Sequence, residues 1–129
     1  MTPEYFNFPD TSIPGVSQTV ATGPWVTISG QLAFANGVLI GKDDPVAQAK
    51  QCFANVAAAL ALAGCGLSDV VKLTCFLKDA SVYPAYAAIK SSLFVERAPA
   101  GTAVIVAGLL LPEALLEIEA TAVRRWTRT

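Results

Sequence analysis

Two carboxylates near the C-terminal end of the chain are the side chains best suited to acid–base chemistry. Glu117 and Glu119 lie in the stretch LLEIEATAV, residues 115–123, which is otherwise apolar or small. The alternation predicts a strand, and residues two apart on a strand point to the same face of a sheet. The pair is therefore expected either to supply a catalytic base with a companion or to form the solvated side of a strand.

The absence of histidine limits the chemistry that the rest of the chain can add. Without histidine, Ser-His-Asp and Cys-His nucleophile systems and most zinc sites are excluded. Three cysteines, Cys52, Cys65 and Cys75, are an odd number without CxxC spacing, so they predict neither a disulfide framework nor a metal site. Cys65 lies in a Gly-rich turn that can be exposed, whereas the other two are expected inside a helix and a strand. Catalysis is then left to carboxylates, backbone groups, hydroxyls, lysine or arginine.

Composition indicates one domain, spanning residues 1–129, that associates with copies of itself. A chain of 129 residues can bury a substantial core, and 53% of its residues are hydrophobic. So much apolar side chain in a short chain favours a homo-oligomer. A net charge of −1 provides no electrostatic footprint for nucleic acid, and the RWTR segment at 125–128 is expected to be a solvated tail. No apolar run is long enough for a membrane span, and no signal peptide is recognisable, so a cytoplasmic protein is expected.

The elements that must position these residues follow the order β-β-β-α-β-α-β-β. Asp44-Pro45 marks a helix start, Asn36-Gly37 a hairpin turn, and residues 1–14 an irregular arm. Two helices are expected to cover one face of the sheet, which leaves the other face, with Val70 and Phe76, uncovered. Strands are expected at 16–21, 25–31, 38–40, 69–77, 102–107 and 115–124, and helices at 45–63 and 81–95.

Four stretches in order resemble the RidA/YjgF family, the reactive intermediate deaminases. They are VTISGQ at 26–31, NVAAAL at 55–60, AGCGLSDVVKLTCFLKD at 63–79 and APAGTAVIVAGLLLPEALLEIEATAV at 98–123. The resemblance covers nearly the whole chain, from Pro14 to Arg125. It implies an α+β, chorismate-mutase-like fold with a six-stranded mixed sheet, two helices on one face, and a homotrimer with sites between subunits. It also implies hydrolysis of enamines or imines to a 2-oxo acid and ammonia, without metal or cofactor.

The resemblance also assigns roles to individual positions. Glu117 matches the glutamate that directs water, which makes Glu119 a bystander. Ser29 and Gly30 match a Ser-Gly pair whose glycine offers a backbone amide to the ligand, although Gly30 can equally be a bulge glycine. Ala103 matches a position whose backbone carbonyl faces the site. Glu117 itself has an alternative role, as a residue that ties subunits together or faces water.

Several site positions depart from the family pattern. Gly101 stands where active members carry the arginine that anchors the substrate carboxylate, Ala103 replaces a cysteine, and Val16 replaces a tyrosine. An asparagine of the second helix corresponds to Ala87. Arg97 is either a displaced anchor or a solvated arginine at a helix end.

These departures favour a Rid-like hydrolase of a substrate other than small 2-imino acids. The alternative is a trimer of the same fold that binds a small molecule or a client protein without catalysis. An endoribonuclease is disfavoured by the net charge and the lack of histidine.

Overall fold

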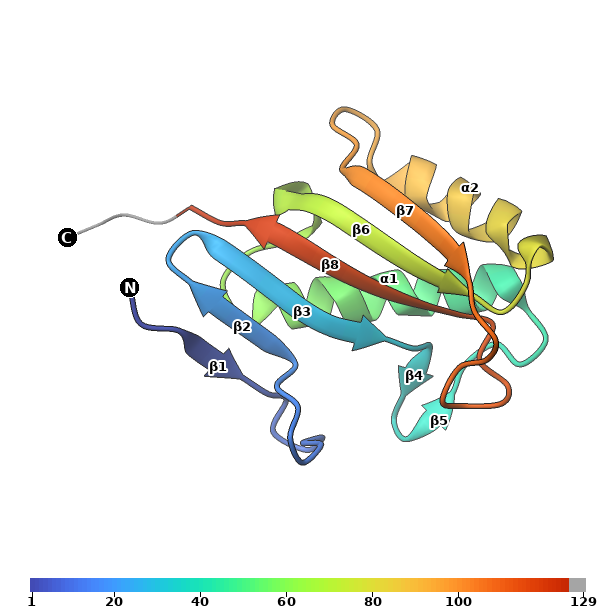
Figure 1. The fold of residues 1–129 in the computed structure, drawn as a ribbon, viewed down its shortest axis with the longest axis horizontal. Coiled ribbons are helices and arrows are strands. Elements are labelled where there is room, and N and C mark those ends of the chain that lie inside the picture. Colours follow the sequence, from blue (N-terminus) through green and yellow to red (C-terminus); the bar gives the residue numbers. More distant parts are fainter. Residues whose placement is uncertain (126–129) are drawn as a thin grey trace.

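A six-stranded mixed sheet carries two helices on one face (Figure 1). The computed structural model describes residues 1–125, so most of the predicted RWTR tail lies outside the described residues. The strands are β1 (Glu4–Phe6), β2 (Thr19–Thr22), β3 (Trp25–Gln31), β4 (Phe34–Ala35), β5 (Val38–Leu39), β6 (Val70–Leu77), β7 (Ala100–Ile105) and β8 (Leu116–Val123); the helices are α1 (Pro45–Ala61), α2 (Tyr83–Leu93) and the short 3-10 helices η1 (Leu67–Asp69) and η2 (Ala80–Val82).

The strand order of the main sheet is β1-β2-β3-β8-β6-β7. Only the β6–β7 pair is parallel, and α2 forms the connection between these two strands. The C-terminal strand β8 inserts antiparallel between β3 and β6. The predicted α+β fold with a mixed sheet and helices on one face is therefore confirmed.

The start of α1 follows from its first residues. The Asp44 side chain accepts a hydrogen bond from the Ala47 amide at 3.1 Å, and Pro45 occupies the first turn, where its missing amide costs nothing. The helix ends at Ala61, and Gly64 then takes a positive φ of +76°, which a glycine adopts without strain.

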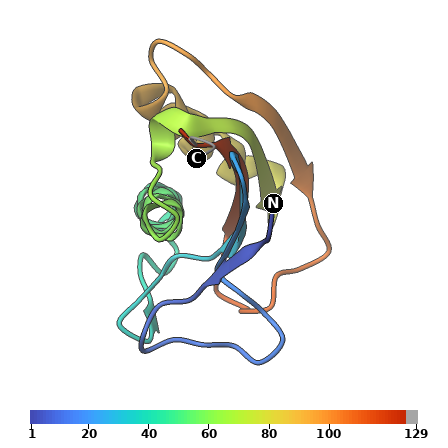
Figure 2. The ribbon, with the colours of Figure 1, turned by 90° about the vertical axis from the view of Figure 1, so that its left-hand side faces the viewer.

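The core lies between the sheet and the helices. Figure 2 shows α1 end-on against one side of the curved sheet. Phe53, Val56 and Leu60 of α1 are buried, as are Leu116 and Ile118 of β8 beneath them. These residues recur at helical spacing in α1 and at every second position in β8, which is why each element has one apolar face.

Three details differ from the sequence-based expectation. The predicted strand at 38–40 does not join the main sheet; β5 pairs with β4 in a separate hairpin around Asn36 and Gly37. The arm at residues 1–14 contains β1, which supplies the sixth strand by pairing with β2. Val70 is buried and Val71 exposed, the reverse of the expected alternation, because the β6–β8 register shifts between Val70 and Lys72.

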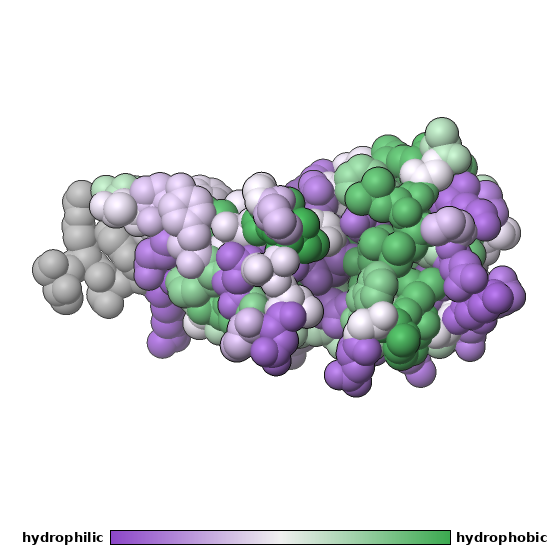
Figure 3. All heavy atoms as spheres, turned by 90° about the horizontal axis from the view of Figure 1, so that it is seen from below, coloured by the Kyte–Doolittle hydropathy of each residue, from purple (hydrophilic) through white to green (hydrophobic). Residues whose placement is uncertain are grey.

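The face of the sheet opposite the helices is uncovered in this chain, and much apolar surface is exposed. Trp25 on this open face is 57% exposed, and Leu110 in the loop after β7 is 94% exposed. Figure 3 shows apolar side chains gathered where the β4–β5 hairpin, with exposed Phe34 and Val38, and the β7–β8 loop lie. No helix among the described residues is long and apolar enough to cross a membrane.

Candidate active site

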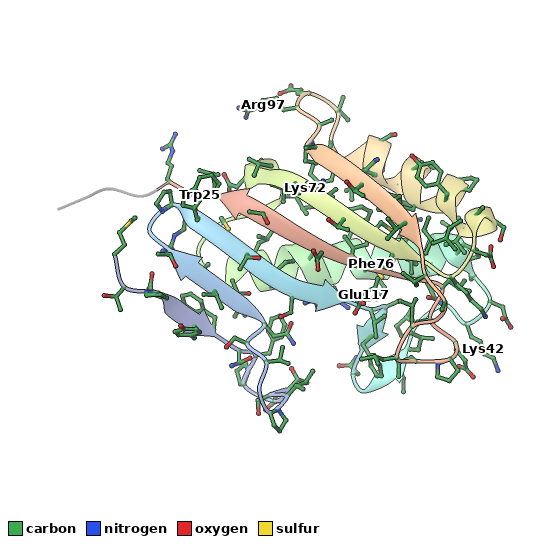
Figure 4. The ribbon with its side chains drawn as sticks, in the orientation of Figure 1. Trp25, Lys42, Lys72, Phe76, Arg97 and Glu117 are labelled. Carbon is green, nitrogen blue, oxygen red and sulfur yellow. The ribbon has the colours of Figure 1, made fainter. Side chains whose placement is uncertain are left out.

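Glu117 and Glu119 lie on the open face of the sheet. Along β8, Leu116 and Ile118 are buried against the helices, whereas Glu117 is half-buried and Glu119 is exposed. The alternation therefore places both carboxylates on one face, as their spacing predicts. Figure 4 shows Glu117 beside the end of β3.

The Glu117 carboxylate occupies space that the missing side chain of Gly30 leaves free. A Cβ atom added at Gly30 would lie 2.9 Å from both Cδ and Oε2 of Glu117. Real Cβ atoms do not come so close to other heavy atoms, so the observed position of the carboxylate requires a glycine here. The two residues that the family resemblance assigns to one site are therefore in contact.

A bulge in β3 produces this contact. The ladder pairs Ile28 with Ala120 and Gln31 with Ile118, so Ser29 and Gly30 together lie opposite a single residue of β8. Such a bulge leaves an unpaired residue and bends the strand locally. The structure thus shows Gly30 to be a bulge glycine that at the same time adjoins the candidate base.

Hydrogen bonds hold the bulge in place. The Ser29 hydroxyl donates to the Ser17 carbonyl at 2.6 Å, and the Ser29 amide donates to the Gln18 carbonyl at 2.9 Å. The buried Gln31 amide group donates to Gln18 Oε1 at 2.8 Å and to the Ser29 carbonyl at 2.9 Å. Gln31 was not predicted as a site residue, although its position directly after Ser-Gly in VTISGQ was a usable signal.

The electrostatic environment of Glu117 favours a carboxyl group that holds its proton more tightly than usual. Partial burial raises the pKa of Glu117, and the neighbouring Glu119 carboxylate raises this pKa further. Directly opposite Glu117 on β6 lies Phe76, which adds apolar surface. A carboxyl with a raised pKa, near a strand bulge on an open face, has the properties of a general base or acid.

The two β7 positions with predicted binding roles face the other side of the sheet. Gly101 and Ala103 pair with Leu73 and Cys75 of β6, and both partners are buried on the helix-covered face. Because paired residues in a ladder point to the same face, positions 101 and 103 face the helices. They are nevertheless exposed, because β7 is the edge strand of the sheet.

One chain alone does not bring Glu117 and Gly101 together. Glu117 pairs with Phe76, and Phe76 pairs with Val104, which is three residues along β7 from Gly101. The two positions are separated by about 10 Å across the strands and about 10 Å along them, on opposite faces.

The remaining predicted residues lie at opposite ends of the sheet. Val16 is exposed and precedes Ser17, the acceptor of the Ser29 hydroxyl, so it lies near the Ser29–Gly30 bulge. Arg97 is exposed far from Glu117 (Figure 4). It contributes to a hollow of about 420 Å³ whose lining includes Asp69, Pro99 and Val123.

Besides Gln31, two further residues that the sequence did not predict influence the candidate site. Lys90 of α2 places Nζ 3.9 Å from the position of a Cβ atom at Gly101. Gln48, fully buried in α1, accepts from the Leu115 amide at 2.8 Å and donates to the Gly41 and Glu113 carbonyls, and thereby fixes the start of β8. The sequence does indicate the role of Gln48, because this residue is polar although it lies within the apolar stripe of α1.

The cysteines do not have the environment of reactive thiols. Cys52 and Cys75 are buried, and Cys65 is partly exposed. Burial raises the pKa of Cys75 to about 12 and raises the pKa of both Cys52 and Cys65. All three therefore remain neutral thiols near pH 7. Within residues 1–125, no three Asp, Glu, Cys or His side chains gather in a way that could hold a metal ion.

The chain matches the protein-family model described as Endoribonuclease L-PSP over residues 10–124. It is 38% identical to the RutC family protein slr0709 of Synechocystis, over 83% of this chain and 84% of that protein. It is 37% identical to the 2-iminobutanoate/2-iminopropanoate deaminase of Salmonella typhimurium, over 84% of this chain and 86% of that protein. The crystal structure of the Escherichia coli YjgF gene product superimposes with a TM-score of 0.79 at 35% identity, over 88% of this chain and 91% of that chain.

Proposed function

Because the chain belongs to the RidA/YjgF family, we propose that it is a metal-independent hydrolase that converts an enamine or imine to a carbonyl compound and ammonia. Glu117 is the catalytic base of this reaction. The observation that carries the proposal is the contact of the Glu117 carboxylate with the Gly30 bulge. The chain retains a glycine where any other residue would displace the carboxylate.

The chemistry assigned to Glu117 is proton transfer. The ionised carboxylate takes a proton from water as the water oxygen bonds to the imine carbon, and it passes this proton to the nitrogen, which gives a carbinolamine. The carboxylate then takes the hydroxyl proton of the carbinolamine and delivers it to the nitrogen as the carbon–nitrogen bond breaks, so that ammonia leaves and the carbonyl forms. A carboxylate with a raised pKa is a stronger base than an ordinary glutamate, which favours uptake of the proton from water before the proton is returned.

The substrate differs from the small 2-imino acids that the Salmonella deaminase is named for. Gly101 offers no side chain at the position of the family's arginine anchor. Loss of a charge-assisted contact of this kind weakens binding by about tenfold to a hundredfold. A small 2-imino acid has little other surface with which to compensate, whereas a larger substrate does.

A homotrimer completes the site in this proposal. The helix-facing side of β7 from one subunit and the Glu117 face of the next line a shared cleft. Two observations support this arrangement: Glu117 and Gly101 lie on opposite faces within one chain, and the open face exposes apolar side chains such as Trp25 and Val71. Exposed apolar surface of this kind favours association.

Ammonia release from 2-iminobutyrate and from larger or neutral enamines, generated in the assay, tests the proposal. We expect turnover of at least one larger substrate, its loss in Glu117→Gln, and its retention in the matched variant Glu119→Gln. Light scattering is expected to give the mass of three chains. Failure to turn over any substrate, or full activity of Glu117→Gln, contradicts the assignment.

A second function, non-catalytic binding of a small molecule or client protein by the same trimer, is favoured by Gly101, because the chain lacks the family's anchor there. A ligand that binds without turnover is its distinguishing result. Endoribonuclease activity, which the family description names, has no support in a chain with net charge −1 and no histidine.

A further inference from the structure

A lysine of α2 lies where the side chain of residue 101 would begin. The Lys90 ammonium is 3.9 Å from the position of a Cβ atom at Gly101, which is ordinary van der Waals contact. An arginine at position 101 would extend its guanidinium several bonds outward from that point. The chain therefore keeps a positive charge at this part of β7. This charge comes from α2 and lies closer to the β7 backbone than the guanidinium of an arginine at position 101 would.

An aromatic ring holds the Lys90 ammonium. Nζ lies 5.1 Å from the centroid of the Tyr86 ring, one helical turn earlier, at a distance typical of a cation–π interaction. The Tyr86 ring is itself buried and stacked on Phe53 at 5.7 Å between centroids. The ammonium is thus attached to a rigid part of the core.

The positive charge of Lys90 is not neutralised by the chain. No carboxylate among residues 1–125 lies within 4.0 Å of Lys90, since the salt bridges among these residues are Lys42–Glu113 and Arg124–Glu4. Lys90 is only partly exposed. A partly buried cation without a counter-charge is a favourable position for an anion.

The hydroxyl of Tyr86, on the ring that holds the Lys90 ammonium, is a second unused polar group. It is buried, and within the described part of the chain it has no hydrogen-bond partner. An unpartnered buried hydroxyl costs free energy that a bound oxygen atom recovers. On the adjoining strand, Gly101 and Ala103 are exposed and small, so the strip beside Lys90 is accessible from the sheet edge.

We propose that Lys90, supported by the Tyr86 ring and hydroxyl, is the anion anchor of the substrate site. The inference rests on the proposed function in one respect, namely that the anion belongs to the imine or enamine substrate. Because the ammonium lies at the base of position 101, the anionic group must reach farther than one held by an arginine there. The substrate class is an imine or enamine whose carboxylate is separated from the reacting carbon by several bonds.

Binding of glutarate to the full-length protein, measured by calorimetry, tests the anchor independently of turnover. We expect glutarate to bind, its uncharged diamide not to bind, and Lys90→Met to weaken glutarate binding by about tenfold to a hundredfold. Lys90→Arg is expected to restore most of the affinity. The matched control is Lys50→Met, an exposed lysine of α1, which is expected to bind glutarate like the wild type.

The hydroxyl is tested by Tyr86→Phe, which keeps the ring beneath Lys90. We expect glutarate affinity to fall severalfold while the folded state remains intact by circular dichroism. Wild-type affinity in folded Lys90→Met, or no glutarate binding to the wild type at millimolar concentration, overturns the anchor. Lys90-dependent binding without ammonia release from any substrate supports the anchor and contradicts the hydrolase instead.

Discussion

Replacing Gly30 with alanine adds one carbon atom where the Glu117 carboxylate lies. The new Cβ would be 2.9 Å from Cδ and Oε2 of Glu117. Carbon contacts are most favourable at about 3.5–4.0 Å, so the carboxylate must move by about 0.6–1.1 Å. A displacement of about 1 Å in a reacting group can cost about a hundredfold in rate. We therefore expect kcat/KM for imine hydrolysis to fall by about tenfold to a hundredfold in Gly30→Ala.

Stability is expected to change little in the same variant. The backbone of Gly30 does not have a positive φ, so alanine fits its conformation, and the displaced group is the end of a flexible side chain. The free energy of unfolding, measured by urea denaturation, should stay within about 1 kcal/mol of the wild type. Gly66→Ala is the matched control, since a Cβ at Gly66 meets open space, and we expect it to keep full activity and stability.

A double variant distinguishes displacement of Glu117 from any other effect of the added methyl group. In a Glu117→Ala background the clash is absent, so Gly30→Ala should cause no further loss of the residual rate. Wild-type kcat/KM in Gly30→Ala would refute the reasoning. So would an equal fractional loss in both backgrounds, because the methyl group would then act without the carboxylate.

Four further outcomes follow from the electrostatics and the buried hydrogen bonds. Because Glu119 raises the pKa of Glu117, Glu119→Gln should move the acid limb of the pH profile of kcat/KM to lower pH, and an unmoved limb contradicts the coupling. The raised pKa also means that protonated Glu117 contributes stability that is fully present below pH 4.5 and is lost as the pH rises through the pKa of Glu117 in the folded state. Urea denaturation at a series of pH values should show this dependence in the wild type and not in Glu117→Gln. Gln48→Leu should lower the free energy of unfolding by about 2–4 kcal/mol, because it removes three hydrogen bonds and leaves the Leu115 amide and the Glu113 carbonyl unpaired. Arg124→Met, which removes hydrogen bonds to the Gly23 and Ala63 carbonyls, should lower it by about 2 kcal/mol, and unchanged denaturation midpoints would show these bonds to be dispensable.

Local patterns were sufficient to predict most elements of the fold. Asp44-Pro45 predicts the start of α1 because capping depends on residues adjacent in the chain. Asn36-Gly37 predicts the β4–β5 turn because both residues tolerate a positive φ. The separation of two between Glu117 and Glu119 predicts a shared face, since side chains on a strand alternate.

Register and strand partners depended on contacts between distant segments, which periodicity does not encode. The bulge near Val70 reverses which valine is buried, and β1 joins the sheet only because β2 offers it an edge. Neither feature has a signal within its own short stretch of sequence.

The family resemblance by itself paired Glu117 with Ser29 and Gly30, and identified Gly101 as the position that lacks an anchor. Only the tertiary structure showed the Glu117 carboxylate filling the space above Gly30, and Gly101 on the opposite face of the sheet. It alone placed Lys90 beside Gly101. The physical reason is that sequence order specifies neighbours along an element, whereas helix-to-strand packing decides which side chains from separate elements share a site.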